Sequence, residues 1–164
     1  MGRFWLIGLG VLALATPALA ADPKGDWLVN DKAAVIRVAA CGTALCGHIA
    51  WVIKPGGTDT NNPDASKRNR PILGLPILLN MQPKGNRWEG EVYNAKDGKI
   101  YASNISLRSD NVLKIEGCVL GFLCGGEDWK RVKCEEVAPP AAAPGGARPP
   151  APRTLVTACK EVTP

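Results

Sequence analysis

Beyond residue 20 the sequence has no long hydrophobic run, a single histidine and no C-x-x-C motif, and these absences exclude several classes of function. A structural zinc site usually needs Cys and His ligands at close spacing, and His48 is the only histidine. Without C-x-x-C, a dithiol redox enzyme is disfavoured as well. No nucleophile–base pair and no phosphate-binding loop is visible. We therefore expect a protein that is not an enzyme and that holds neither a cofactor nor a metal.

The strongly apolar stretch at the N-terminus predicts a cleavable signal peptide over residues 1–20. Arg3 supplies the positive charge, residues 4–15 are mostly apolar, and residues 18–20 follow the small-x-small pattern of a cleavage site. The apolar part is too short for a stable membrane anchor, and no cysteine follows the cleavage site to carry a lipid. We expect a periplasmic or secreted monomer without a membrane span.

The charged residues do not form the basic patch that nucleic-acid binding requires. The net charge is +5, but acidic residues lie between the lysines and arginines along the whole chain. Asp59, Asn61 and Asp64 form a loose group of oxygen ligands that could hold calcium. They lack the spacing of an EF-hand loop, and capping of the local turn is the alternative. We expect neither nucleic acid nor calcium as a partner.

All six cysteines lie beyond residue 20, and an even number in an exported chain predicts disulfides. A zinc site is the alternative, which the single histidine disfavours. The short spacings favour two local pairs and leave two cysteines whose state stays open: Cys41–Cys46, Cys118–Cys124, and the remaining Cys134 and Cys159.

Short alternating apolar runs, separated by Gly, Asn, Asp and Pro, predict an all-β domain over residues 22–134. Residues 135–164 read as a Pro/Ala-rich linker and tail, in which residues 154–162 could form one short strand. The predicted strands of the domain are 25–30, 33–41, 46–53, 75–81, 87–93, 99–108, 112–118 and 124–134.

Hairpin registers that keep one face apolar predict how these strands pair, because a slip of one residue would invert every side chain. Eight strands joined in this way form a small antiparallel up-and-down β-barrel. Residues 54–71 are too polar and too long for a hairpin loop, and we expect one short helical turn there, capped by Asn62, over a barrel mouth. The expected cross-strand pairs are Cys41–Cys46, Ile36–Trp51, Val92–Tyr101, Trp88–Ile105, Gly90–Ser103, Leu107–Leu113, Ile105–Ile115, Leu113–Trp129, Cys118–Cys124 and, as an outer ion pair, Lys114–Asp128.

The inward face of this barrel predicts a ligand pocket. Gly90, Ser103 and Gly117 fall together on three neighbouring strands and leave space, with aromatic walls and one inward carboxylate, Glu127. The alternative is a filled core, in which the glycines bend strands and Glu127 lies near an open end. The expected ligand-binding residues are Trp51, Trp88, Gly90, Tyr101, Ser103, Ile105, Ile115, Gly117, Glu127 and Trp129.

Two groups of residues outside the lumen have competing interpretations. Arg68 and Arg70 are expected near the mouth, where they could bind a carboxylate or phosphate. The alternative is a solvated turn, or Arg70 paired with a structural acid. His48 takes the outer face in the predicted register, and we expect an exposed strand residue rather than a catalytic base.

The pair formed by Gly25-x-Trp27 at the first strand and Arg131 at the last resembles the lipocalin and calycin arrangement. That resemblance implies that Arg131 covers Trp27 at the closed end of the barrel. A wider set of motifs resembles the small exported bacterial proteins of domain-of-unknown-function family 2147, over about residues 25–132. It implies a lipocalin-like barrel and no established activity. Its motifs are Cys41-Gly42, Leu45-Cys46-Gly47, Asn62-Pro63, Arg68-x-Arg70-Pro71-x-x-Gly74-Leu75, Trp88-x-Gly90, Asp97-Gly98-Lys99-x-Tyr101 and Trp129-x-Arg131.

These observations favour a non-catalytic binding protein that holds a small, mainly apolar ligand, with Arg68 and Arg70 available for an anionic end. The alternative is a cell-envelope interaction or scaffold protein with a filled barrel and a functional tail.

Overall fold

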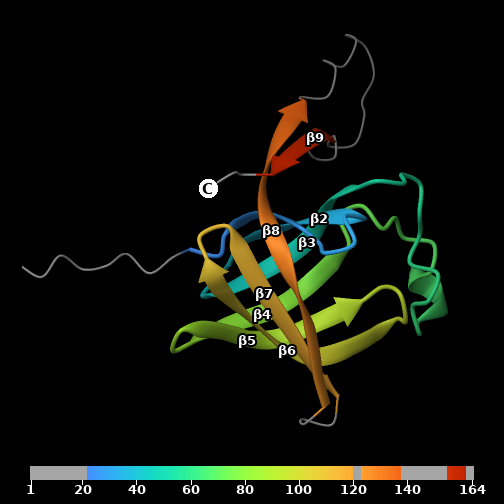
Figure 1. Ribbon diagram of the computed structural model, residues 1–164. Helices are drawn as coiled ribbons and strands as arrows, with labels where there is room; N and C mark the ends of the chain where they lie inside the picture. Colours follow the sequence, from blue (N-terminus) through green and yellow to red (C-terminus); the bar gives the residue numbers. More distant parts are fainter. Residues whose placement is uncertain (1–21, 120–122, 138–154, 162–164) are drawn as a thin grey trace, which may run out of the picture.

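The computed structural model describes residues 22–119, 123–137 and 155–161, and these residues are mostly β-structure (Figure 1). No helix in these ranges is long and apolar enough to cross a membrane. The strands are β1 (Gly25–Leu28), β2 (Ala34–Cys41), β3 (Ala44–Val52), β4 (Pro76–Lys84), β5 (Arg87–Asn94), β6 (Lys99–Ser109), β7 (Val112–Val119), β8 (Leu123–Val137) and β9 (Leu155–Glu161), with the 3-10 helix η1 (Ala65–Lys67) between β3 and β4.

The first eight strands form a closed antiparallel barrel. Each pairs with its neighbour in chain order, and β8 pairs back onto β1. This closure consists of three cross-strand pairs: Asp26–Val132, Trp27–Arg131 and Leu28–Lys130. The predicted eight-stranded up-and-down barrel is therefore confirmed.

The predicted registers of β5 to β8 are confirmed residue by residue. Val92 lies opposite Tyr101, and the same pairing extends through β7 to β8. Lys114 and Asp128 also lie opposite each other, but their ion pairs differ from the prediction. Lys114 pairs with Glu116 on its own strand, and Asp128 pairs with Arg108 at 3.0 Å.

The hairpin of β2 and β3 has a tighter turn than predicted. Cys41 lies opposite Ala44, not opposite Cys46, because Gly42 adopts a φ of +67° and permits a two-residue loop. The disulfide Cys41–Cys46 still forms, along a diagonal with the Cα atoms 5.8 Å apart. The register differs by two residues, so the side chains from Ile36 to Ile49 keep their predicted faces.

β3 contains one extra residue, Ala50, which changes the face of the residues that follow. Ile36 lies opposite Ile49, whereas Val35 lies opposite Trp51, so Ala50 has no partner of its own. Such a bulge reverses the alternation of side chains. Trp51 therefore lies on the outer face, opposite the fully buried Val35. The prediction that Trp51 lies opposite Ile36 and lines the lumen is wrong for this reason.

A second bulge, at Asn80 in β4, explains why residue 90 is a glycine. Asn80 has a φ of +49°, and residues 80–81 share the place opposite Gly90 on β5. A Cβ atom on Gly90 would lie 2.6 Å from the carbonyl oxygen of Leu79 and 2.7 Å from that of Asn80. The β4 backbone therefore fills the space that the sequence suggested for a ligand beside Gly90.

The lumen is filled by apolar side chains over most of its length. The core includes five side chains with no exposed surface: Trp27, Leu78, Met81, Ile105 and Leu113. They belong to four different strands, so the core extends across the barrel. At about 25 cal/mol for each Å² of apolar surface removed from water, such a core supplies the main stabilising contribution of the fold.

The long connection between β3 and β4 contains the predicted helical turn, η1, beside the end of the barrel where β5 and β6 meet (Figure 1). Its N-cap is Asp64, whose side chain accepts a hydrogen bond from the Ser66 amide at 3.0 Å. Asn62, the expected cap, instead accepts the amide of Asp64 at 2.9 Å. The cap therefore lies two residues later than predicted.

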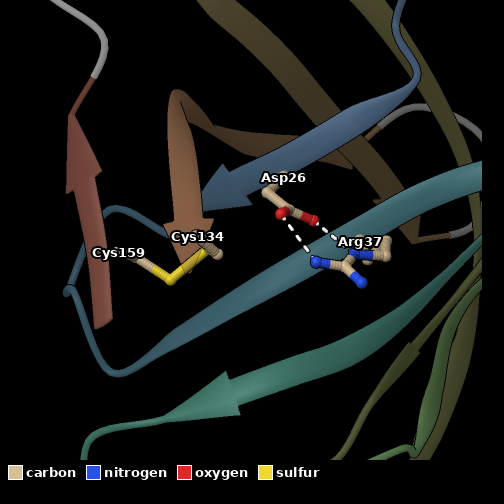
Figure 2. The surroundings of a disulfide bond; sticks show 4 residues. All are labelled: Asp26, Arg37, Cys134 and Cys159. Atoms are coloured by element: carbon tan, nitrogen blue, oxygen red, sulfur yellow. Dashed lines mark hydrogen bonds and ion pairs between the residues drawn. A yellow bond between two sulfur atoms is a disulfide. The ribbon is translucent and has the colours of Figure 1, made fainter. Parts of the chain in front are cut away.

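The strand expected near the C-terminus is present as β9, and it pairs with the part of β8 that extends past the barrel (Figure 1). Figure 2 shows the disulfide between Cys134 of β8 and Cys159 of β9, near the ion pair of Asp26 and Arg37 on β1 and β2. Arg37 Nε lies 2.7 Å from Asp26 Oδ1. Cys118 and Cys124 form the third disulfide. Each of the three disulfides therefore links two strands that are neighbours in the sheet.

The bulge at Asn80 predicts that Gly90 tolerates no side chain. Gly90→Ala should lower the free energy of unfolding by about 1–3 kcal/mol, because the new methyl group overlaps two carbonyl oxygens of β4. Gly117→Ala is the matched control: its Cβ would lie 3.7 Å from the nearest side-chain atoms, and we expect a change below about 1 kcal/mol. Urea denaturation followed by tryptophan fluorescence measures both. Equal stabilities of the two variants would contradict the bulge.

Because β9 lies outside the barrel, we predict that it can detach from β8 without unfolding the barrel once its disulfide is removed. In the Cys134→Ser/Cys159→Ser double variant, a two-stranded ribbon remains without its covalent link, and such ribbons are marginally stable. Trypsin should then cleave at the exposed Lys133 and Lys160 faster than in the parent, while the tryptophan fluorescence of the barrel is retained. Cys118→Ser/Cys124→Ser is the control that leaves β9 linked. Unchanged cleavage in the first variant would show that β9 does not need the disulfide.

Candidate functional site

The closed end of the barrel is built on Trp27 and Arg131, as the sequence suggested. The Arg131 guanidinium carbon lies 4.1 Å from the centroid of the Trp27 ring. Arg131 also donates to the carbonyl oxygens of Asp110, Lys24 and Asp22 at 2.5, 2.7 and 2.9 Å. Desolvation by burial lowers the pKa of Arg131 from its ordinary value. Arg131 covers this end, so a ligand would have to enter the lumen from the opposite mouth.

Half of the ten residues predicted to bind a ligand belong to the packed core. Ile105, Ile115 and Trp129 are buried, and the half-buried Trp88 packs against them. Ser103 is buried too, and its hydroxyl donates to the carbonyl oxygen of Glu116 at 2.8 Å. These side chains form the floor below the mouth rather than the walls of a deep cavity.

Nearer the mouth, the inner face of β6, β7 and β8 is partly exposed and carries two glycines. Gly117 and Gly125 lie directly opposite each other, one row toward the rim from Ile115 and Glu127. Within the described part of the chain, a Cβ on Gly125 would have no atom within 4 Å, and one on Gly117 would meet only ordinary contacts. Tyr101 is half-buried beside them, and its hydroxyl donates to Asp97 Oδ2 at 2.5 Å. We define the mouth recess by Tyr101, Gly117, Gly125 and Glu127.

Glu127 is the acidic group of this recess. The register places it on the inner face, opposite Ile115, and its side chain is exposed. Its Oε1 atom accepts a hydrogen bond from the indole Nε1 of Trp129 at 2.5 Å. This bond holds the carboxylate against the apolar floor at a defined position.

The rim of the mouth is bridged by an ion pair between two turns. Lys96 lies in the turn between β5 and β6, and Asp31 lies in the turn between β1 and β2. The Nζ atom of Lys96 is 2.8 Å from Oδ2 of Asp31. These turns lie on opposite sides of an eight-stranded ring, so the pair spans the mouth. The hydrogen bond and charge of Asp31 raise the pKa of Lys96, and the charge of Glu127 adds to this effect. Both partners are exposed, so the bridge contributes little to stability.

The 54–71 connection is fastened to β5 by a buried carboxylate, for which the sequence suggested a calcium ligand or, as the alternative, a cap of the local turn. Asp59 is fully buried and accepts hydrogen bonds from Tyr93 at 2.6 Å, Asn62 at 2.7 Å and Arg70 at 2.8 Å. Arg70 also lies 5.6 Å from the centroid of the Tyr93 ring. One feature of the sequence could have indicated this contact. Tyr93 falls on the outward face of a predicted strand, where a large aromatic side chain suggests that another segment covers it.

Hydrogen bonding keeps Asp59 ionised despite its burial. Burial alone would raise the pKa of this carboxyl group, but the bonds from Tyr93, Asn62 and Arg70 outweigh it and hold the pKa below its ordinary value. Burial and the bond to Asp59 raise the pKa of Tyr93. The network is therefore a charged, fully bonded clamp between the connection and the barrel.

The clamp occupies the residues predicted to bind an anion or calcium. Arg70 is bound to Asp59, and Arg68 donates its Nε to the carbonyl oxygen of Asn62 at 2.8 Å. Asp64 caps η1, and Asn61 donates to the carbonyl oxygen of Lys96 at 3.0 Å. In the described part of the chain, no three His, Cys, Asp or Glu side chains gather in a way that could hold a metal ion.

Two further features lie on the outer surface. His48 is half-buried opposite Arg37 on β2, as its predicted face requires. A depression of about 290 Å³ runs along β8, and its basic side chains already pair with acidic ones. Its lining residues are Asn30, Arg108, Lys114, Gly126, Glu127 and Asp128.

Comparison with known proteins agrees with this architecture. Residues 25–131 match the family described as "Uncharacterized protein conserved in bacteria (DUF2147)". The chain belongs to the DUF2147 family. Among solved structures it is similar to protein HP1028 from the human pathogen Helicobacter pylori, which is described as belonging to the lipocalin family. The TM-score is 0.61 at 19% identity, over 68% of this chain and 83% of that one. No curated protein matches the sequence.

Family membership and the shared fold make this DUF2147 protein a lipocalin-like barrel, and they assign it no activity. Its three disulfides are typical of proteins that fold in an oxidising compartment outside the bacterial cytoplasm. The region expected to be a signal peptide, residues 1–20, lies outside the described residues.

The clamp predicts a stability contribution from Asp59 that depends on pH. Because its folded pKa is lower than the unfolded value of about 4, the contribution is present above pH 4 and is lost as the pH falls through the folded pKa. Asp59→Asn should lower the free energy of unfolding by about 2–3 kcal/mol at pH 7, since it leaves Arg70 without its carboxylate.

Chemical denaturation at pH 7 and pH 3 measures this effect. The difference between parent and Asp59→Asn should shrink at the lower pH. Asp128→Asn, which removes an exposed carboxylate, is the control and should have a small effect at both values. A deficit for Asp59→Asn that is the same at pH 7 and pH 3 would contradict the ionised clamp.

Proposed function

We propose that this DUF2147 protein is a non-catalytic binding protein that holds a small, mainly apolar ligand at the open mouth of its barrel. The observation that carries the proposal is the mouth recess, where the opposed glycines Gly117 and Gly125 leave space above a floor of buried apolar side chains. Small residues on apolar walls, with a few placed polar groups, are typical of ligand sites.

The packed core limits the size of the ligand. Ile105 and Leu113 have no exposed surface, and Trp129 and Ile115 close the floor directly below the recess. A ligand would therefore insert one end between β6, β7 and β8 and leave its remainder near the rim. Tyr101 and Glu127 are the polar groups within reach of that end.

A cell-envelope interaction protein is the second candidate, and the extension of β8 favours it. β8 is 15 residues long and continues past the barrel to Val137, where β9 is its partner. Such a ribbon offers main-chain groups along its edges for another extended chain. Pull-downs with and without residues 138–164 test this candidate, because a partner of the ribbon should disappear with the tail.

Filling the recess tests the binding function. N-phenyl-1-naphthylamine, an uncharged apolar dye, should gain fluorescence with the parent protein and should lose this gain with Gly125→Leu. The leucine has open space at this position, so the variant should fold and occupy the site itself. Thr43→Leu is the matched control, since it adds the same side chain to the exposed β2–β3 turn.

Native mass spectrometry of protein purified from periplasm completes the test. We expect a bound small molecule in the parent and in Thr43→Leu, and none in Gly125→Leu. A parent protein that carries no ligand, binds no dye and shows no thermal shift across a lipid panel would overturn the proposal.

A further inference from the structure

The charge that faces the mouth recess is negative. Glu127 uses one carboxylate oxygen to accept the indole N–H of Trp129, and within the described residues Oε2 accepts no hydrogen bond. Ile115 and Trp129 below it are buried, whereas the carboxylate itself is exposed to solvent. A carboxylate against an apolar floor gains from a partner of opposite charge.

Space for such a partner lies directly beside the carboxylate. Gly125 is two residues before Glu127 on the same face of β8, and Gly117 lies across from it on β7. Among the described residues, no atom lies within 4 Å of a Cβ built on Gly125. These residues therefore leave open the position from which a ligand atom would approach Glu127.

The basic groups that the sequence suggested for an anionic ligand are bonded elsewhere. Arg70 is held by Asp59, on the outer side of β5, and Arg68 is bonded to the carbonyl oxygen of Asn62. Lys96 is at the rim, but Asp31 binds it at 2.8 Å. Among the described side chains that form the recess, Glu127 is the charged one.

We infer that the mouth recess selects an amphipathic ligand whose polar end is a cationic amine, with Glu127 as its acceptor. The inference rests on the proposed binding function and specifies its ligand class. The ammonium group donates to the carboxylate, which Trp129 holds in place, and the apolar chain lies over Gly117, Gly125 and Tyr101. Glu127 is thus the residue that determines specificity, while the glycines provide space.

Three probes with the same decyl chain test this assignment: decylammonium, decanol and decanoate. Each displaces N-phenyl-1-naphthylamine from the protein, at concentrations below micelle formation. The parent should bind decylammonium at least about tenfold more tightly than decanoate, with decanol between them. Glu127→Gln should reduce the affinity for decylammonium to that for decanol and change the affinity for decanol less than about twofold. Asp128→Asn, which removes the neighbouring carboxylate on the outer face, should leave all three affinities unchanged.

The outcomes separate this inference from the function on which it rests. If none of the three probes binds, the binding function fails, and the ligand class fails with it. If decanol binds but decylammonium has no advantage, or decanoate binds best, the recess is a ligand site and the cationic assignment is wrong. A preference for decylammonium that survives Glu127→Gln would likewise overturn the role of Glu127.

Discussion

The barrel depends on one short closure, in which Trp27 and Arg131 are the central pair. β1 meets β8 over three residues, so main-chain pairing alone holds little of the ring together. Arg131 adds a cation over a fully buried indole, a contact worth about 1–2 kcal/mol when partly desolvated. Its three bonds to carbonyl oxygens also tie the N-terminal segment and the β6–β7 turn to the same point. Gly25 is required there, because a side chain would collide with the guanidinium group.

The open mouth follows from the unequal lengths of the two strands that close the barrel. β1 has 4 residues and β8 has 15, so β8 pairs with β7 from Leu123 onward but meets β1 no earlier than Lys130. Gly125 and Glu127 lie in the part of β8 that β1 does not reach, and their inner face stays exposed. The closure that covers one end of the barrel therefore leaves the inner face of β8 uncovered at the other.

The sequence predicted the fold and the registers of β5 to β8, because in those hairpins one face must be buried and a slip of one residue would expose it. It failed where an extra residue enters a strand. Nothing in the composition around Ala50 or Asn80 signals a bulge, yet these bulges turn Trp51 outward and fill the space at Gly90. The two-residue difference at Cys41 was invisible to the same reasoning, since it leaves every face unchanged. A glycine in a strand does not by itself show why a side chain is missing. At Gly90 the β4 backbone takes the place of a side chain, whereas at Gly125 the described residues leave the place open.

The charge of the site illustrates the same limit. Arg68 and Arg70 stand close together in a loop predicted near the mouth, and without a partner they would have favoured an anionic ligand. The partner is Asp59, which reaches Arg70 because Tyr93 and Asn62 hold its carboxylate in a buried position. Tyr93 is 34 residues away in the sequence, and its place on the outer face of β5 follows from barrel register rather than local pattern. Once the protein provides the anion for Arg70, the charge left facing the recess is that of Glu127. The proposed ligand preference is therefore opposite in sign to the anionic one, because of a contact whose acidic partner the sequence did not identify.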